Sequence, residues 1–263
     1  MSNLRQPVVP RLMLDTGVDI PFPAAQVSIS QPLIKDISRL GEESNFFIGA
    51  NALTKNYKAI QDNFDLSQLS NFEILMTMIM QKDANVQKIK ENIEQLLSLI
   101  FPNYQILITP RSIILVDEEK KHFMIDADNF DAFADIIYDM FCLKEFHGEH
   151  GDDGYNPAGD RARALIEQIR KGKEKVAALK RERGEDNALM SVLERYISIL
   201  AVGERKNKNE LANYTVFQLV DEFKRFQLKE TFDFTFQAKM AGAQKIKDAK
   251  DWTGDLESND KED

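Results

Sequence analysis

The chain has 263 residues, a length that suits one large domain or two modest ones. It carries 34 Lys and Arg against 43 Asp and Glu, and its formal net charge of −9 disfavours binding to nucleic acid and anionic membranes. The single cysteine, Cys142, cannot form an internal disulfide or a zinc site by itself, so a reducing compartment is expected. This composition excludes a collagen, a disulfide scaffold, a disordered chain and a basic DNA-coating protein.

Neither an export signal nor a membrane span is predicted. The residues before Pro10 lack the apolar stretch of a signal peptide. The longest apolar patch, Ile74 to Met80, falls far short of the ~20 residues that cross a bilayer. We therefore expect a soluble protein that stays inside a cell and does not bind a membrane.

Residues 1–146 are predicted to form an α+β domain, in which helices pack on a small antiparallel sheet. Its first part predicts two short strands, 11–14 and 26–29, joined by a proline-rich connection. Because proline lacks the N–H group of a sheet ladder, these strands should lie at an edge. Pro32 is then expected to open a helix.

The second part of this domain shows clearer periodicity. Apolar residues at three- and four-residue spacing predict two helices between Phe72 and Phe101. Short polar connections then predict a meander of three strands, at 104–108, 112–116 and 122–125. A final helix, with Phe133 and Phe141 on its apolar face, should be capped by Asp128 or Asn129.

The rest of the chain is predicted to be all helical. Residues 147–155 contain three glycines and several acids, which indicates a linker before a helical domain at 156–247. Residues 248–263 are mostly polar and acidic, which indicates a mobile acidic tail. Within the helical domain we expect helices at about 157–183, 189–202, 214–226 and 232–243.

The sequence offers no convincing catalytic, cofactor or metal site. The densest group of metal-binding side chains lies in the glycine-flanked linker, which provides no rigid frame: His147, Glu149, His150, Asp152 and Asp153. The acidic stretch at 126–131 lacks the glycine and the final acid of a calcium loop. Cys142 follows an apolar stripe and is expected to be an inert thiol. We therefore predict that the protein is not an enzyme.

The predicted helix 157–183 is basic, with nine Lys or Arg against four acids. A basic stripe can bind nucleic acid, but no aromatic residue is interleaved to stack on bases. The charges equally suit a solvated face with pairs such as Glu167 and Lys171, or contact with an acidic partner, including the tail of this chain. These three interpretations stay open, with nucleic acid the least favoured.

Seven aromatic rings fall within 23 residues near the end of the helical domain. They are Tyr214, Phe217, Phe223, Phe226, Phe232, Phe234 and Phe236. A helical core explains most of them, but two short helices do not easily bury seven rings. The remainder would then form an exposed apolar patch that binds a partner.

Several motifs follow one another along the chain: SQPLIKDI (30–37), YNPA (155–158), IRKGK (169–173), RYISIL (195–200), NYTVFQL (213–219) with Glu222 and Arg225, and AGA (241–243) with Asp251 and Trp252. In this order they resemble the tail assembly chaperones of long-tailed bacteriophages that infect Gram-positive hosts. Each motif is structural, and the acidic residues 255–263 and the insertion 181–187 depart from the pattern.

The resemblance implies a protein of the host cell cytoplasm that acts in tail assembly and is absent from the mature virion. It implies a helical partner, the tape-measure protein, with the tail tube protein as a second candidate partner. Nine methionines, among them Met76, Met78 and Met80, would suit such an adaptable apolar contact. We place the partner contact at Tyr214, Phe217, Gln218, Phe223, Arg225, Phe226 and Phe232. The alternative function is a structural tail or baseplate component that stays in the virion.

Overall fold

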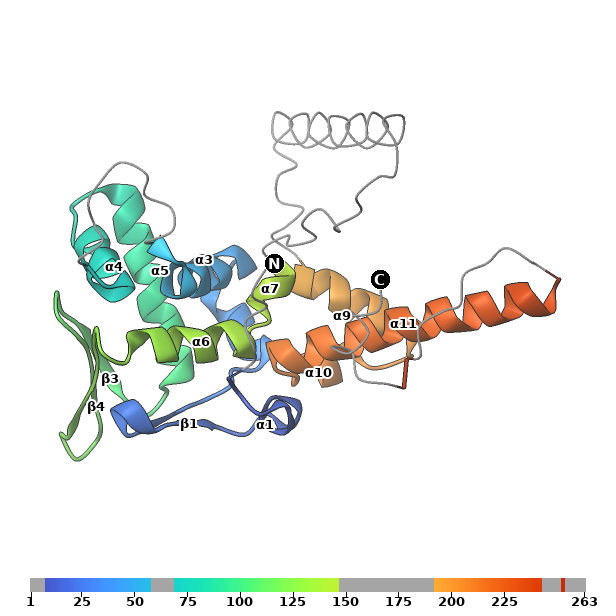
Figure 1. Ribbon diagram of the computed structural model, residues 1–263, viewed down its shortest axis with the longest axis horizontal. Helices are drawn as coiled ribbons and strands as arrows, with labels where there is room; N and C mark the ends of the chain where they lie inside the picture. Colours follow the sequence, from blue (N-terminus) through green and yellow to red (C-terminus); the bar gives the residue numbers. More distant parts are fainter. Residues whose placement is uncertain (1–7, 58–68, 147–191, 243–251, 254–263) are drawn as a thin grey trace.

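The computed structural model describes residues 8–57, 69–146, 192–242 and 252–253 (Figure 1). These residues form an α+β fold, in which helices accompany one two-stranded and one three-stranded antiparallel sheet. This agrees with the fold class predicted from the sequence. The predicted linker 147–155, the basic helix 157–183 and the tail apart from Trp252 and Thr253 lie outside the described residues. The domain boundaries therefore remain predictions.

The first described element is a helix, α1 (Arg11–Thr16), so the strand predicted at 11–14 is wrong. Gly17 ends this helix in the left-handed conformation, with φ 67°, and its N–H group bonds to the carbonyls of Met13 and Leu14. Leu14 alone of the helix is buried. A glycine terminator and one buried side chain suit a short surface helix better than a strand.

The two-stranded sheet consists of β1 (Ile20–Phe22) and β2 (Val27–Ile29), joined by the 3₁₀ turn η1 (Pro23–Ala25). β2 agrees with the strand expected at 26–29. Pro21 lies within β1, as a sheet with only edge strands allows. The helix expected after Pro32 is short, because α2 (Ile34–Ile37) continues directly as the 3₁₀ turn η2 (Ser38–Leu40).

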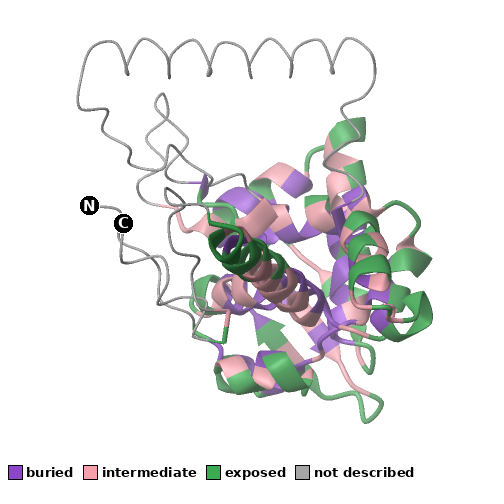
Figure 2. Cartoon of the chain, turned by 90° about the vertical axis from the view of Figure 1, so that its right-hand side faces the viewer, coloured by how far each residue is buried: buried purple, intermediate pink, exposed green. Residues whose placement is uncertain are grey.

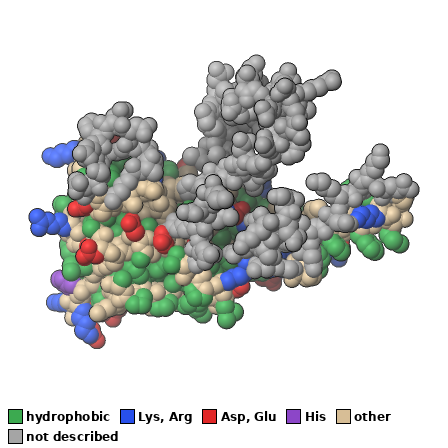
Figure 3. All heavy atoms as spheres, viewed as in Figure 1, with side chains coloured by type: hydrophobic (Ala, Val, Ile, Leu, Met, Phe, Trp, Pro, Cys, Tyr) green, Lys and Arg blue, Asp and Glu red, His purple; other side chains and the backbone are tan. Residues whose placement is uncertain are grey.

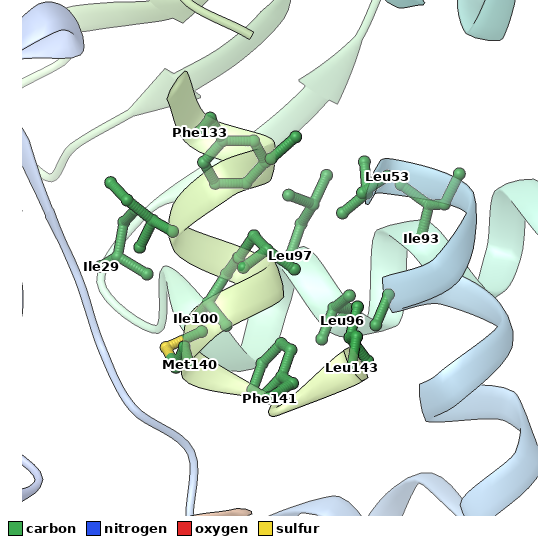
Figure 4. Packing of buried hydrophobic residues seen from close by; sticks show 14 of the residues in the cluster. Ile29, Leu53, Ile93, Leu96, Leu97, Ile100, Phe133, Met140, Phe141 and Leu143 are labelled. Atoms are coloured by element: carbon green, nitrogen blue, oxygen red, sulfur yellow. The ribbon is translucent and has the colours of Figure 1, made fainter. Parts of the chain in front are cut away.

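The main core lies among α3 (Glu43–Thr54), α5 (Ala84–Ile100) and α6 (Phe130–Met140), as Figure 4 shows. α4 (Asn71–Ile79) and α5 are the two helices predicted between 72 and 101. α3 and α5 approach closely at Gly49, where a Cβ atom would lie 2.7 Å from the carbonyl oxygen of Asn92. Phe46, Phe101, Phe133 and Phe141 are almost completely buried in this core.

The three-stranded sheet has the predicted meander order, β3 (Gln105–Ile108), β4 (Ile113–Val116) and β5 (His122–Ile125). The turn after β5 differs in detail from the prediction. Asn129 precedes α6 but does not cap it, because Oδ1 accepts the N–H of Asp126 (2.9 Å) and Nδ2 donates to the carbonyl of Met124 (3.1 Å). Its side chain therefore ties the turn to β5. The short helix α7 (Leu143–Phe146) follows α6.

The last described helices are α9 (Val192–Gly203), α10 (Lys208–Leu211) and α11 (Val216–Met240). α9 agrees with the helix expected near 189–202. The two helices expected at 214–226 and 232–243 are one continuous helix, α11, so the predicted break is wrong. Residues 227–231, of which Leu228 is the one apolar residue, include no glycine or proline, so nothing in this stretch interrupts the helix.

The start of α11 is joined to the N-terminal part of the chain. Leu33 forms an isolated antiparallel bridge with Thr215, and the N–H of Ile34 donates to the carbonyl of Tyr214 (2.9 Å). Further along, Nζ of Lys224 lies 2.5 Å from a carboxylate oxygen of Glu145 in α7. Buried side chains of α9, α10 and α11 belong to the same apolar cluster as those of α3, α5 and α6.

Glu43 joins α3 to the first turn of α9. Its carboxylate accepts the N–H of Leu193 (3.1 Å), and the N–H groups of Val192 and Glu194 also stabilise its charge. Burial raises the pKa of Glu43 above its usual 4.5, and these hydrogen bonds only partly counter the effect. The folded chain therefore holds this proton more tightly than the unfolded chain.

We predict that Glu43→Gln flattens the pH dependence of stability. Because the folded pKa is raised, the contribution of Glu43 to the free energy of unfolding is largest below pH 4.5 and declines as pH rises through the folded pKa. Glutamine keeps an oxygen acceptor but does not titrate. Urea unfolding at several pH values between 4 and 7 measures this slope. Glu42→Gln, at an exposed neighbour, is the control, and an unchanged slope in Glu43→Gln contradicts the assignment.

Candidate partner-binding surface

α11 begins with a capping box that also ties it to α1. Oγ1 of Thr215 accepts the N–H of Gln218 (3.2 Å), and Oε1 of Gln218 accepts the N–H of Thr215 (2.9 Å). Nε2 of Gln218 donates to the carbonyl of Asp15 at 2.8 Å. Both polar atoms of this side chain, which the sequence suggested for partner binding, therefore bond within the chain.

The first three turns of α11, residues 216–226, pack into the body of the protein, and we call them the root. The ring of Phe223 stacks on that of Tyr196 in α9, with centroids 3.8 Å apart and planes 13° apart. Phe226 lies so close to Gly203 that a Cβ atom there would overlap its ring. The buried side chains of the root are Val216, Leu219, Val220 and Phe223.

Charged side chains hold the exposed side of the root. Arg11 of α1 pairs with Asp221, and its guanidinium carbon lies 5.7 Å from the ring centre of Phe217. Nε of Arg225 also contacts Asp221, at 3.1 Å, and Nη1 of Arg225 donates to the carbonyl of Trp252 at 3.4 Å. These contacts fix the direction in which α11 leaves the body.

A second charged cluster holds the loop before α11. Nζ of Lys206 lies 3.2 Å from the hydroxyl of Tyr214 and 5.5 Å from its ring centre, and it pairs with Glu222 and Glu204. Burial lowers the pKa of Lys206, but the hydrogen bonds to Glu222, Tyr214 and Glu204 outweigh burial and raise it. Tyr214 thus stabilises the loop between α10 and α11.

The last part of α11, residues 228–240, projects from the body, and we call it the distal arm (Figures 1 and 2). Leu228 at its start is half-buried, but the four large apolar side chains beyond it are exposed: Phe232 by 37%, Phe234 by 71%, Phe236 by 58% and Met240 by 75%. Hydrophobic side chains line the visible edge of this projection in Figure 3. The distal arm is therefore the main exposed aromatic surface among the described residues.

The structure separates the residues that we predicted to bind a partner into two groups. Only Phe232 lies on the distal arm. The others contribute to the anchoring of α11, and of these Phe223 is buried while the rest are half-buried: Tyr214, Phe217, Gln218, Phe223, Arg225 and Phe226.

Three residues of the distal arm were missing from the predicted contact: Phe234, Phe236 and Met240. The four-residue spacing from Phe232 to Met240 through Phe236 marks one face of a helix and could have indicated Phe236 and Met240, but not Phe234, which lies on the opposite face. The methionines expected to provide contact area lie elsewhere, because Met76 is fully buried in α4 and Met78 is half-buried beside it.

A smaller apolar surface lies on the outer face of the three-stranded sheet. Leu107 pairs with Ile114 across β3 and β4, and Ile114 pairs with Met124 across β4 and β5, so the three side chains form a row on one face. Leu107 and Met124 are both more than half exposed. The opposite face of the sheet carries the buried Ile113, Leu115 and Ile125.

The described residues contain no cluster of three metal-binding side chains, and none of their helices is long and apolar enough to cross a membrane. The candidate ligands His147, Glu149, His150, Asp152 and Asp153 lie outside them. Burial raises the pKa of the Cys142 thiol to about 12, so this group is protonated at neutral pH and is a weak nucleophile.

We predict very different losses of stability for alanine substitutions at two phenylalanines of α11. Phe223→Ala removes a buried stacked ring and should lower the free energy of unfolding by about 3–5 kcal/mol. Phe234→Ala removes an exposed ring and should change it by less than about 0.5 kcal/mol. Urea unfolding followed by circular dichroism compares the two variants. A similar loss in both would contradict the division into root and distal arm.

Comparison with known proteins links the same part of the chain to phages. Residues 185–257 match a protein-family model described as the YomV second domain, and YomV belongs to a phage region of Bacillus. The match includes α9, α10 and α11 but less than half of the chain. No curated protein and no solved structure matches the chain. The comparisons therefore indicate a phage-associated protein.

Proposed function

We propose that the protein is a tail assembly chaperone of a long-tailed phage. It binds the tape-measure protein in the host cell cytoplasm while the tail assembles and is absent from the mature virion. The observation that carries this proposal is the exposed aromatic surface of the distal arm. The arm lies within residues 185–257, the part of the chain that matches the YomV second-domain family. The order of sequence motifs that resemble tail assembly chaperones supports it.

The partner that the resemblance implies is long and largely helical, with apolar stripes that are uncovered until the tail tube forms around it. Such a helix aggregates through these stripes unless another protein covers them. A helix with exposed Phe and Met side chains can cover them by packing side by side. The net charge of −9 would keep the complex soluble. Binding of this kind requires no catalytic residue, cofactor or metal.

Replacing Phe232 and Phe236 together by serine should weaken binding to fragments of the tape-measure protein. Truncation of two aromatic anchors at an interface typically lowers affinity by tenfold or more, about 1.4 kcal/mol. Co-purification from cells that produce both proteins, followed by titration with the purified fragments, measures the effect. Val202→Ser, at an 82% exposed residue of α9, is the matched control.

The two variants must first be shown to unfold at the same temperature as the unmodified chain, which their exposure leads us to expect. If the Phe232 and Phe236 variant then binds as tightly as the Val202 variant, the distal arm is not the contact. If the unmodified chain binds no fragment of the tape-measure protein, the chaperone function itself is rejected.

One observation favours the alternative, a structural tail or baseplate component. The row Leu107, Ile114 and Met124 lies on the sheet, and the distal arm projects at the other end of the molecule (Figure 1). Apolar surfaces at two ends would suit a subunit held permanently between neighbours.

The composition of purified virions separates the two functions. We expect the protein in lysates of infected cells and not in purified particles, as measured by quantitative mass spectrometry of both fractions. A fixed number of copies per particle, comparable to that of other tail proteins, would instead establish the structural component. The tail tube protein in the same samples provides the internal standard.

A further inference from the structure

The apolar side chains of the distal arm lie on two opposite faces. An α-helix turns by about 100° per residue, so Phe232, Phe236 and Met240 follow one another at about 40° intervals along one stripe. Phe234 lies about 160° from Phe236, on the other side of the helix. The buried residue of the arm, Thr235, lies between the two faces and leaves both exposed.

The face of Phe234 continues an interface that already exists within the chain. Phe234 follows Phe223 by eleven residues, which places the two within about 20° of the same direction. Phe223 packs against Tyr196 of α9, and α9 ends at Gly203 beside Phe226. Phe234 therefore lies on the same face of α11 that α9 covers in the root, about two helical turns beyond the point where α9 ends.

The distal arm carries no net charge. Lys229 and Lys239 balance Glu230 and Asp233, and Nζ of Lys229 lies 3.4 Å from the carboxylate of Asp233. This balance contrasts with the net charge of −9 on the whole chain. A partner of either charge can approach such a surface, so apolar complementarity has to provide the recognition.

We propose that the distal arm inserts between two apolar-striped helices of the same partner protein. One helix extends the line of α9 and packs on Phe234, while the other packs on Phe232, Phe236 and Met240. The apolar stripe by which one helix contacts another is about 100° wide, so a single helix cannot cover faces about 160° apart. This inference rests on the proposed function and adds that the bound unit is a pair of helices.

Titration with a synthetic amphipathic peptide that carries a single leucine stripe tests the geometry without the natural partner. The full-length chain should bind two peptides by isothermal titration calorimetry. Phe234→Ser should bind one, and the double variant Phe232→Ser with Phe236→Ser should also bind one. The triple variant should bind none, and Val202→Ser should still bind two.

Other results overturn the proposal. A single bound peptide on the unmodified chain, loss of all binding in Phe234→Ser, or no binding at all means that the two faces are not independent helix sites. If light scattering finds a dimer that the triple variant converts to a monomer, a second copy of the chain covers the arm instead. Failure to bind the tape-measure protein while two peptides still bind would reject only the chaperone function.

Discussion

Anchoring of the root of α11 is the interaction on which the rest of the molecule depends. The helix is held on its apolar side by the stack of Phe223 on Tyr196, and at its start by the bond from Gln218 to the carbonyl of Asp15. Lys224 fixes it to α7 through Glu145. Since these contacts come from distant parts of the chain, the distal arm continues a helix whose direction is already set. An arm held in this way exposes its side chains without first ordering a flexible segment, which avoids an entropic cost on binding.

The regular parts of the fold could be predicted because their burial follows one simple period. The three-stranded sheet alternates between buried and outward residues, and α5 and α6 each carry one continuous apolar stripe. The short run at 11–14 lacks such a signal, because four apolar or mixed residues suit a strand and a helix equally. Gly17, as a terminator of α1, was the better indicator.

The candidate surface could be predicted only in part, because the spacing of apolar residues does not distinguish a ring that is buried in the fold from one that is exposed to solvent. Phe223 and Phe234 point in nearly the same direction from α11, yet Phe223 is buried and Phe234 is 71% exposed. The difference is made by α9, whose end at Gly203 decides how far the root extends. That limit depends on how two helices pack in space, which a single sequence does not display.

The exposed rings of the distal arm are divided between two faces of the helix. Charged side chains accompany both faces, because Lys229 and Lys239 lie within or beside the stripe of Phe232, Phe236 and Met240, and Asp233 and Glu230 lie between that stripe and Phe234. A flat surface can cover only one of the two faces at a time. The partner proposed above would contact both faces at once, because its two helices lie on either side of the arm. Under that proposal, selectivity would follow from the placement of Phe234 opposite Phe236, because a partner with only one apolar face would leave one side of the arm uncovered, and no charged group would be needed to provide it.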